Sequence, residues 1–152
     1  MRHLALALAL SALTGCAWYD SVTGHDTLGT LRNNHVRWAQ LHATDYQFVY
    51  ARGCECLDES VAITVNNGFV FGVYKLPAGP AVAPEQRGNY PTIDSLFALA
   101  ERELKLGHLA EITYDAGSHF PTMIHVRPSD PDGDYTISVS AFFNYTGMFR
   151  PE

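Results

Sequence analysis

The chain has 152 residues, of which 47% are hydrophobic, so it can build the core of one domain but hardly of two. Sixteen acidic residues outnumber ten basic ones, and the formal net charge at pH 7 is −6. No nucleic-acid partner is therefore expected, and no polybasic surface for anionic lipid, because both need clustered Lys and Arg.

A secretory signal peptide is predicted over residues 1–15. Arg2 supplies a positive start, and residues 4–10 alternate Leu and Ala without a break. This apolar run is too short to span a hydrocarbon core of about 30 Å, which needs roughly 20 residues, but it has the length typical of a secretory signal.

The end of this signal, Leu13-Thr14-Gly15-Cys16, resembles the bacterial lipoprotein box. The resemblance implies that Cys16 becomes the lipid-modified first residue of the mature chain, which is then anchored to the membrane. Ala17 stands where an Asp would suggest retention at the inner membrane, so we expect sorting to the outer membrane, facing the periplasm. The alternative is an ordinary cleaved signal whose small residues happen to precede a cysteine.

A tether over residues 16–24 and one domain over residues 25–152 are expected to follow. In the first half of the domain, apolar residues three and four apart predict a helix from Asp26 or Thr27 to about His42. Its apolar face consists of Leu28, Leu31, His35, Trp38 and Leu41 or His42. Residues 46–50, 61–65 and 69–73 alternate in the manner of strands. Asn66-Asn67-Gly68 predicts a hairpin turn between the last two, because Asn and Gly tolerate positive φ.

The second half of the domain repeats this order of elements. Residues 76–91 contain four prolines and predict a loop. Thr92 is a good N-cap for a second helix, which Gly107 would end. The apolar stripe of this helix is Ile93, Leu96, Phe97, Ala100 and Leu104. Strands are expected over residues 110–115, 122–127 and 135–144, the last with apolar residues at alternate positions from Tyr135 to Phe143.

The predicted element order is therefore α-β-β-β-α-β-β-β. Strands joined by short turns form antiparallel sheets, and amphipathic helices cover one face of such a sheet. We predict an α+β fold, a two-layer sandwich in which an antiparallel sheet carries both helices on one face. The repeated order suggests an internal repeat, although the two halves share no residue-level match.

The pair Cys54 and Cys56 is the most specific feature of the domain. Once Cys16 is acylated, these two thiols remain in an oxidising compartment, which allows a local disulfide. Residues i and i+2 of a strand share a face, so both sulfurs could meet, although so small a ring needs distorted backbone. A redox-active pair and a Cu(I) or zinc site are the alternatives. Zinc would need two more ligands, and no Cys or His lies within ten residues.

The histidines of the domain are spread along the chain. His35 and His42 are seven residues apart on the first helix, roughly 10 Å by helix rise, which is too far to chelate one ion. His108, His119 and His125 follow in the second half. We expect scattered surface or capping histidines, with a composite metal or proton-relay site as the alternative.

Asp130, Asp132 and Asp134 match a calcium-binding loop only in part. An EF-type loop needs Asp at positions one, three and five, Gly at six and a distant Glu. Here Gly133 falls at position four, and no Glu follows at the required distance. An Asp-rich turn is expected, with weak binding of a divalent cation as the alternative, and no cofactor is predicted.

Aromatic residues make up 12% of the chain. Core packing is expected for Trp38, Tyr46, Phe48, Tyr50, Phe69 and Phe71. Phe142 and Phe143 are neighbours in the last strand and point to opposite faces, which suggests that a helix or a partner covers one of them. No Ser-His-Asp order, glycine-rich phosphate loop or pair of catalytic carboxylates has convincing spacing, so enzymatic activity is not expected.

Several short motifs occur in a specific order along residues 35–144. They are Trp38, Tyr46-x-Phe48-x-Tyr50, Cys54-x-Cys56, Ile93-Asp94-Ser95-Leu96-Phe97, Tyr114-Asp115 and Phe120-Pro121-Thr122. In this order they resemble a bacterial family of secreted proteins and lipoproteins, domain of unknown function 6174. The resemblance implies that Cys54 and Cys56 belong to a family pattern, which favours structural pairing and ligand binding alike. It supplies no catalytic residue, because that family has no established activity.

The sequence thus favours a non-enzymatic lipoprotein of the cell envelope, whose domain binds an envelope protein or a periplasmic ligand near the membrane. The alternative is a thiol-based metal or redox protein that uses Cys54 and Cys56.

Overall fold

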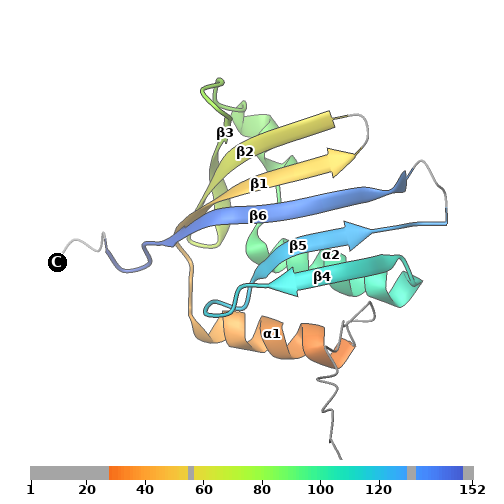
Figure 1. The fold of residues 1–152 in the computed structure, drawn as a ribbon. Helices are drawn as coiled ribbons and strands as arrows, with labels where there is room; N and C mark the ends of the chain where they lie inside the picture. The colour runs from red at the N-terminus through yellow and green to blue at the C-terminus, as the bar shows by residue number, and fades with distance from the viewer. Residues whose placement is uncertain (1–27, 55–56, 130–132, 149–152) are drawn as a thin grey trace, which may run out of the picture.

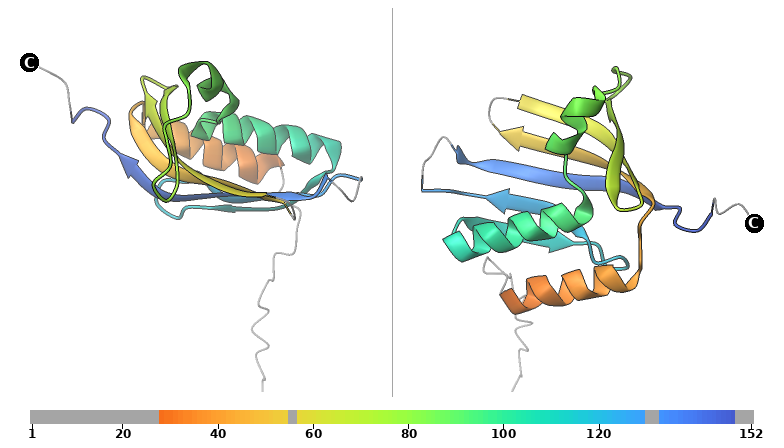
Figure 2. Two further views of the ribbon diagram at one scale, coloured as in Figure 1. Left: turned by 90° about the horizontal axis from the view of Figure 1, so that it is seen from above. Right: turned by 180° about the vertical axis from the view of Figure 1, so that it is seen from behind.

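The computed structural model describes residues 28–54, 57–129 and 133–148. Within these ranges, six antiparallel strands form one sheet, and two α-helices pack on one face of it (Figures 1 and 2). The elements in chain order are α1 (Leu28–Gln40), β1 (Tyr46–Cys54), β2 (Leu57–Asn66), β3 (Phe69–Lys75), the short 3-10 helix η1 (Pro84–Asn89), α2 (Ile93–Leu106), β4 (Leu109–Tyr114), β5 (Pro121–Val126) and β6 (Tyr135–Asn144). The predicted α+β sandwich is confirmed.

The strand order across the sheet is β3-β2-β1-β6-β5-β4. The segment with η1 and α2 therefore crosses from one edge of the sheet to the other. If the two halves were related by a translation along the sheet, β3 and β6 would run in the same direction. They run in opposite directions, because three antiparallel pairings separate them. If the halves were related by a two-fold axis normal to the sheet, β1 would be the neighbour of β4, but its neighbour is β6. The two halves share the order of their elements and not their arrangement.

The second helix begins and ends where local chemistry predicts. Thr92 is the N-cap, and its Oγ1 accepts a hydrogen bond of 3.2 Å from the backbone N–H of Ser95. Gly107 ends the helix with φ of 75°, a left-handed conformation that costs glycine little. No helix of the described ranges is both long and apolar enough to cross a membrane.

An aromatic cluster joins the end of α1 to β1, to β6 and to the residue just before β5. The Trp38 ring lies 5.5 Å from Tyr46, 6.2 Å from Phe120 and 5.6 Å from Phe142, centroid to centroid, each with an edge-to-face geometry. Trp38, Tyr46 and Phe48 are buried and Tyr50 packs against the core, as predicted.

The prediction that Phe69 and Phe71 pack in the core is wrong. Their exposed fractions are 78% and 65%, whereas Val73 is buried and Val70 packs against the core. The pairing of β2 with β3 shifts between Thr64 and Val65, which leaves Phe71 without a register partner. Such a bulge changes the face on which the following residues lie.

A second bulge lies in β6. Ile137 and Val139 are buried, but Phe143 further along the same alternation is 57% exposed, and Phe142 packs against the core instead. The register with β1 shifts between Gln47 and Val49, and Ala141 has φ of 48°. Beyond Val139 the residues that face the core therefore change from odd to even numbers. Phe143, which the alternation predicts on the core side, lies on the uncovered face of the sheet.

Candidate functional site

A polar cavity of about 410 Å³ lies at the end of the sheet where β1 begins, β2 turns into β3 and β6 ends. In Figure 1, β1, β2 and β6 draw together at this end, from which the chain leaves toward its C-terminus. Three segments that are distant in sequence contribute the lining residues. They are Thr44, Asp45, Asn66, Asn67, Tyr145, Thr146 and Gly147.

The turn between β2 and β3 is held against the start of β1. Asn67 and Gly68 both have positive φ, 49° and 79°, as a two-residue hairpin turn requires. The Gly68 N–H donates to the Thr44 carbonyl over 2.9 Å, and the Asn67 N–H donates to Oδ1 of Asp45 over 3.0 Å. The Asp45 carboxylate therefore positions one wall of the cavity.

The segment after β6 closes the cavity from the other side. Oγ1 of Thr146 accepts hydrogen bonds of 3.0 Å from the backbone N–H groups of Thr44 and Asp45. The Tyr145 N–H donates to the Asp45 carbonyl over 3.0 Å, and the Tyr145 hydroxyl donates to the Val65 carbonyl over 3.1 Å. Burial raises the pKa of Tyr145, and the Asp45 charge adds to that effect. These bonds fix the cavity walls without any contribution from a ligand.

Part of the hydrogen-bonding capacity of the lining is unused. Nδ2 of Asn67 donates to Oδ1 of Asn66 over 2.7 Å. Among the described residues, Nδ2 of Asn66 and Oδ1 of Asn67 have no hydrogen-bond partner, so two neighbouring lining residues keep one free donor and one free acceptor. Asp45 supplies further acceptor positions, since each carboxylate oxygen has two lone pairs. The cavity can bind a group that both donates and accepts hydrogen bonds.

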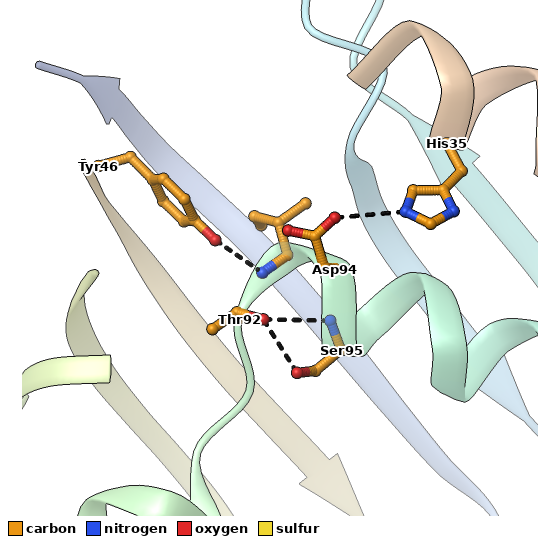
Figure 3. Close-up of polar contacts among 6 residues, drawn as sticks. His35, Tyr46, Thr92, Asp94 and Ser95 are labelled. Carbon is orange, nitrogen blue, oxygen red and sulfur yellow. Dashed lines mark hydrogen bonds and ion pairs between the residues drawn. The ribbon is translucent and has the colours of Figure 1, made fainter. Parts of the chain in front are cut away.

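A second polar network lies at the start of α2 (Figure 3). The Tyr46 hydroxyl accepts a buried hydrogen bond of 3.1 Å from the Ile93 N–H, which ties the helix to β1. Burial raises the pKa of Tyr46 to about 12, and the Asp94 charge adds to that effect. Nε2 of His35 lies 3.3 Å from Oδ1 of Asp94, and its ring stacks on Phe97 at 4.5 Å. The residues of this network join elements of the fold, so we assign it a structural role.

The other predicted histidines do not come together. His42 follows α1 and His119 follows β4, each in a left-handed backbone conformation. Nδ1 of His108 lies 3.2 Å from Oε2 of Glu103, and Nε2 of His125 lies 2.7 Å from Oδ1 of Asp134. Within residues 28–54, 57–129 and 133–148, no group of three or more His, Cys, Asp or Glu is placed to hold a metal ion.

Several predicted sites fall partly or wholly outside the described residues. Cys16, Cys56, Asp130 and Asp132 lie outside them, and Cys54 is described as the last residue of β1. The carboxylate of Asp134 is engaged by His125, whose hydrogen bond lowers the pKa of Asp134. The lipidation of Cys16, the pairing of the two thiols and weak cation binding by the Asp-rich turn remain predictions.

Glu103 is the one buried charged residue among those described, with an exposed fraction of 7%. Burial opposes its ionisation, but hydrogen bonds from Arg102 and His108 prevail and lower its pKa. A lowered pKa stabilises the fold above the pKa of the unfolded chain, and this contribution is lost as the pH falls through the folded pKa. Glu103→Gln is therefore expected to cost about 1–2 kcal/mol in free energy of unfolding at pH 7, and less below about pH 4.

Urea unfolding of the protein between pH 3 and pH 7 measures this difference. The matched control is Glu111→Gln, on an exposed glutamate of β4 that has no ion pair among the described residues. Equal stability of Glu103→Gln and the parent at pH 7 would show that the Arg102–Glu103–His108 contacts contribute nothing.

The residues of the cavity were not identified as a site from the sequence. The sequence predicts Asn66, Asn67 and Gly68 only as a turn, and Thr44 and Asp45 lie between the first predicted helix and the first predicted strand. The sequence contains one signal for this site, because strands that follow one another as antiparallel neighbours place the start of β1 and the end of β2 at the same end of the sheet.

Comparison with known proteins identifies a family and no characterised relative. Residues 30–143 match a family of unknown function, DUF6174. No curated protein matches the chain, and no solved structure matches it either.

Proposed function

The chain belongs to DUF6174, a family of unknown function, and we propose from its sequence and site that it is a lipid-anchored protein of the bacterial cell envelope that binds a ligand without transforming it. The predicted anchor is Cys16, acylated after removal of residues 1–15. Ala17 favours the outer membrane over the inner one, with the domain in the periplasm.

The anchor would keep the binding domain close to the membrane. Residues 17–24 span at most about 29 Å when fully extended. Several acyl chains on one residue hold firmly, because each buried CH₂ contributes about 0.8 kcal/mol. The site would therefore sample only a thin layer of the periplasm next to the membrane surface.

The observation that carries the binding role is the polar cavity at the end of the sheet. Its volume of about 410 Å³ lies within the range of small-molecule sites, roughly 300–1,000 Å³. Its walls are fixed by hydrogen bonds within the protein, which supports a preformed binding site. Its lining contains one carboxylate, from Asp45, and no His, Cys or Lys. A binding role needs no more than this, whereas acid–base and nucleophilic catalysis use a nucleophile or acid paired with a base.

The anchor is tested by expressing the full chain in a bacterium supplied with a labelled fatty acid. The parent is expected to take up label and to sediment with outer-membrane vesicles, whereas Cys16→Ser is expected to lose both properties. Cys54→Ser is the matched control and should behave as the parent does. Label that persists in Cys16→Ser, or a parent that stays soluble and unlabelled, would contradict the proposed anchoring.

The binding role is tested by ligand-detected NMR of the full chain in detergent micelles. The probes are neutral, anionic and cationic polar fragments, each tried against the parent and Asn66→Ala. Binding of any class that weakens in Asn66→Ala supports a ligand site in the cavity. If no class binds in a manner that depends on Asn66, the proposed function is wrong.

A further inference from the structure

We infer that the cavity at the end of the sheet binds a neutral, polyhydroxylated ligand, a saccharide. The inference rests on the proposed function and adds the chemical class of the ligand. Two features of the site carry it: the mixture of hydrogen-bonding groups inside the cavity and the exposed aromatic rings beside it.

The charge of the lining argues against strongly charged ligands. It contains no Lys or Arg, and the Asp45 carboxylate would repel an anion such as phosphate. A hard cation such as Ca²⁺ takes six to eight oxygen ligands, often from several carboxylates, whereas this lining supplies one. Both oxygens of that carboxylate already accept a hydrogen bond, from the Asn67 N–H and the Thr44 hydroxyl. A neutral polar ligand fits these conditions.

The hydrogen-bonding groups match hydroxyls. Each sugar hydroxyl is at once a donor and an acceptor, so a pair of adjacent hydroxyls needs donors and acceptors close together. The unpartnered Nδ2 of Asn66 and Oδ1 of Asn67 provide one of each among the described residues. The remaining lone pairs of Asp45 accept from further hydroxyls, and these bonds to a charged acceptor are the stronger ones.

Two exposed phenylalanines on the uncovered face of the sheet are neighbours of residues that line the cavity. Phe143 is 57% exposed, and its ring stacks on Tyr145, a lining residue, at 6.3 Å between centroids with 28° between planes. Phe69 is 78% exposed and is the register partner of Asn66, so their side chains share a face.

The two bulges account for these positions, because they turn aromatic residues out of the core. The C–H groups on one face of a sugar ring pack against an aromatic face, while the hydroxyls at its edge reach polar groups. Phe143 and Phe69 would supply the aromatic face, and the polar residues that line the cavity would supply the hydrogen-bonding groups. The site therefore offers both kinds of contact that a sugar ring makes.

Isothermal titration of the full chain tests the inference, with the protein in a zwitterionic detergent that has no sugar headgroup. The probes are soluble oligosaccharides of glucose, galactose and N-acetylglucosamine. At least one is expected to bind the parent, and Asn66→Ala is expected to weaken its Kd about tenfold through loss of hydrogen bonds at the cavity. Phe143→Ala is expected to weaken it by a similar factor through loss of the aromatic face.

The matched controls replace an asparagine and an aromatic residue that lie away from the cavity. Asn34→Ala removes an exposed asparagine on α1, and Tyr74→Ala removes an exposed aromatic four residue pairs from Asn66 along β2 and β3. Both should bind as the parent does. Saccharide binding that Asn66→Ala and Phe143→Ala leave unchanged would place the ligand elsewhere and overturn the inference.

Co-sedimentation distinguishes two possible sources of the saccharide, peptidoglycan and lipopolysaccharide. The protein is sedimented with purified peptidoglycan or with lipopolysaccharide vesicles, each with and without a competing soluble oligosaccharide. Asn66-dependent binding to either polymer, displaced by the oligosaccharide, supports the inference and identifies the source. Asn66-dependent binding of a charged fragment or a peptide, with no saccharide bound, overturns the ligand class and leaves the proposed function standing. Failure of every probe overturns both.

Discussion

Replacing Trp38 with alanine is expected to destabilise the protein by about 3–5 kcal/mol. Trp38 has an exposed fraction of 2% and contacts the aromatic rings of Tyr46 in β1, Phe142 in β6 and Phe120 just before β5. Its removal loses the transfer free energy of a large side chain and leaves a cavity whose rigid aromatic walls collapse only in part. Thr44, Asp45 and Tyr145 lie a few residues from these rings, so the same change should also loosen the polar cavity.

Urea unfolding followed by circular dichroism measures the loss. Trp38→Phe keeps an aromatic ring and should lose less, which provides a folded variant if the alanine variant does not fold. Val36→Ala is the control on the same helix, since Val36 is 57% exposed, and it should change stability by less than about 0.5 kcal/mol. A Trp38→Ala loss no larger than the Val36→Ala change would show that the aromatic cluster does not hold α1 to the sheet.

Tyr46→Phe is expected to cost about 1–3 kcal/mol, although it removes one oxygen atom. The Tyr46 hydroxyl accepts the Ile93 N–H at the start of α2, and this bond is buried. The first N–H groups of a helix have no partner within the helix, so phenylalanine would leave a buried donor unsatisfied. The motif around Tyr46 and the motif that begins at Ile93 thus meet in one structural contact.

The pH dependence of this cost has a defined sign. A raised tyrosine pKa means that the neutral hydroxyl stabilises the fold below the unfolded pKa of about 10, and that this contribution is lost as the pH rises toward the folded pKa of about 12. The difference between the parent and Tyr46→Phe should therefore shrink above about pH 10. Tyr74→Phe is the control, because Tyr74 is 49% exposed and its hydroxyl has no hydrogen bond to another described residue. Equal losses in the two variants would contradict the assigned role of Tyr46.

Much of the fold follows from local patterns. The N-cap at Thr92, the stop at Gly107 and the turn at Asn67-Gly68 all occur where predicted, because capping and turn chemistry act within four residues. One part of the predicted loop differs, since residues 84–89 form η1 with Pro84 in its first turn, a position that needs no N–H donor.

The predicted faces of the aromatic residues were right only where the strands are regular. Phe48 is in the core, as alternation from Tyr46 requires. Phe71 and Phe143 lie next to bulges and are exposed. A bulge arises when two residues of one strand oppose one residue of its partner. Alternation within a single strand contains no information about that pairing.

The candidate site was predictable only in part, for a related reason. Each of its segments has a recognisable local role, as a helix break, a hairpin turn or a strand end. That Asp45, Asn66 and Tyr145 line one cavity depends on β1 having β2 on one side and β6 on the other. The pairing of β1 with β6 joins residues about ninety positions apart, and no local pattern specifies it.

The sequence by itself determined the helices, the strands and the antiparallel class of the sheet. It also determined that Trp38, Tyr46 and Phe48 pack in the core. It also carries the predicted lipid anchor at Cys16. The tertiary structure alone decided the strand order, the two bulges and the meeting of three distant segments around the cavity that Asp45 lines. The physical reason is range: capping, turn chemistry and hydrophobic periodicity act over a few residues, whereas register and strand order come from contacts between segments that only folding brings together.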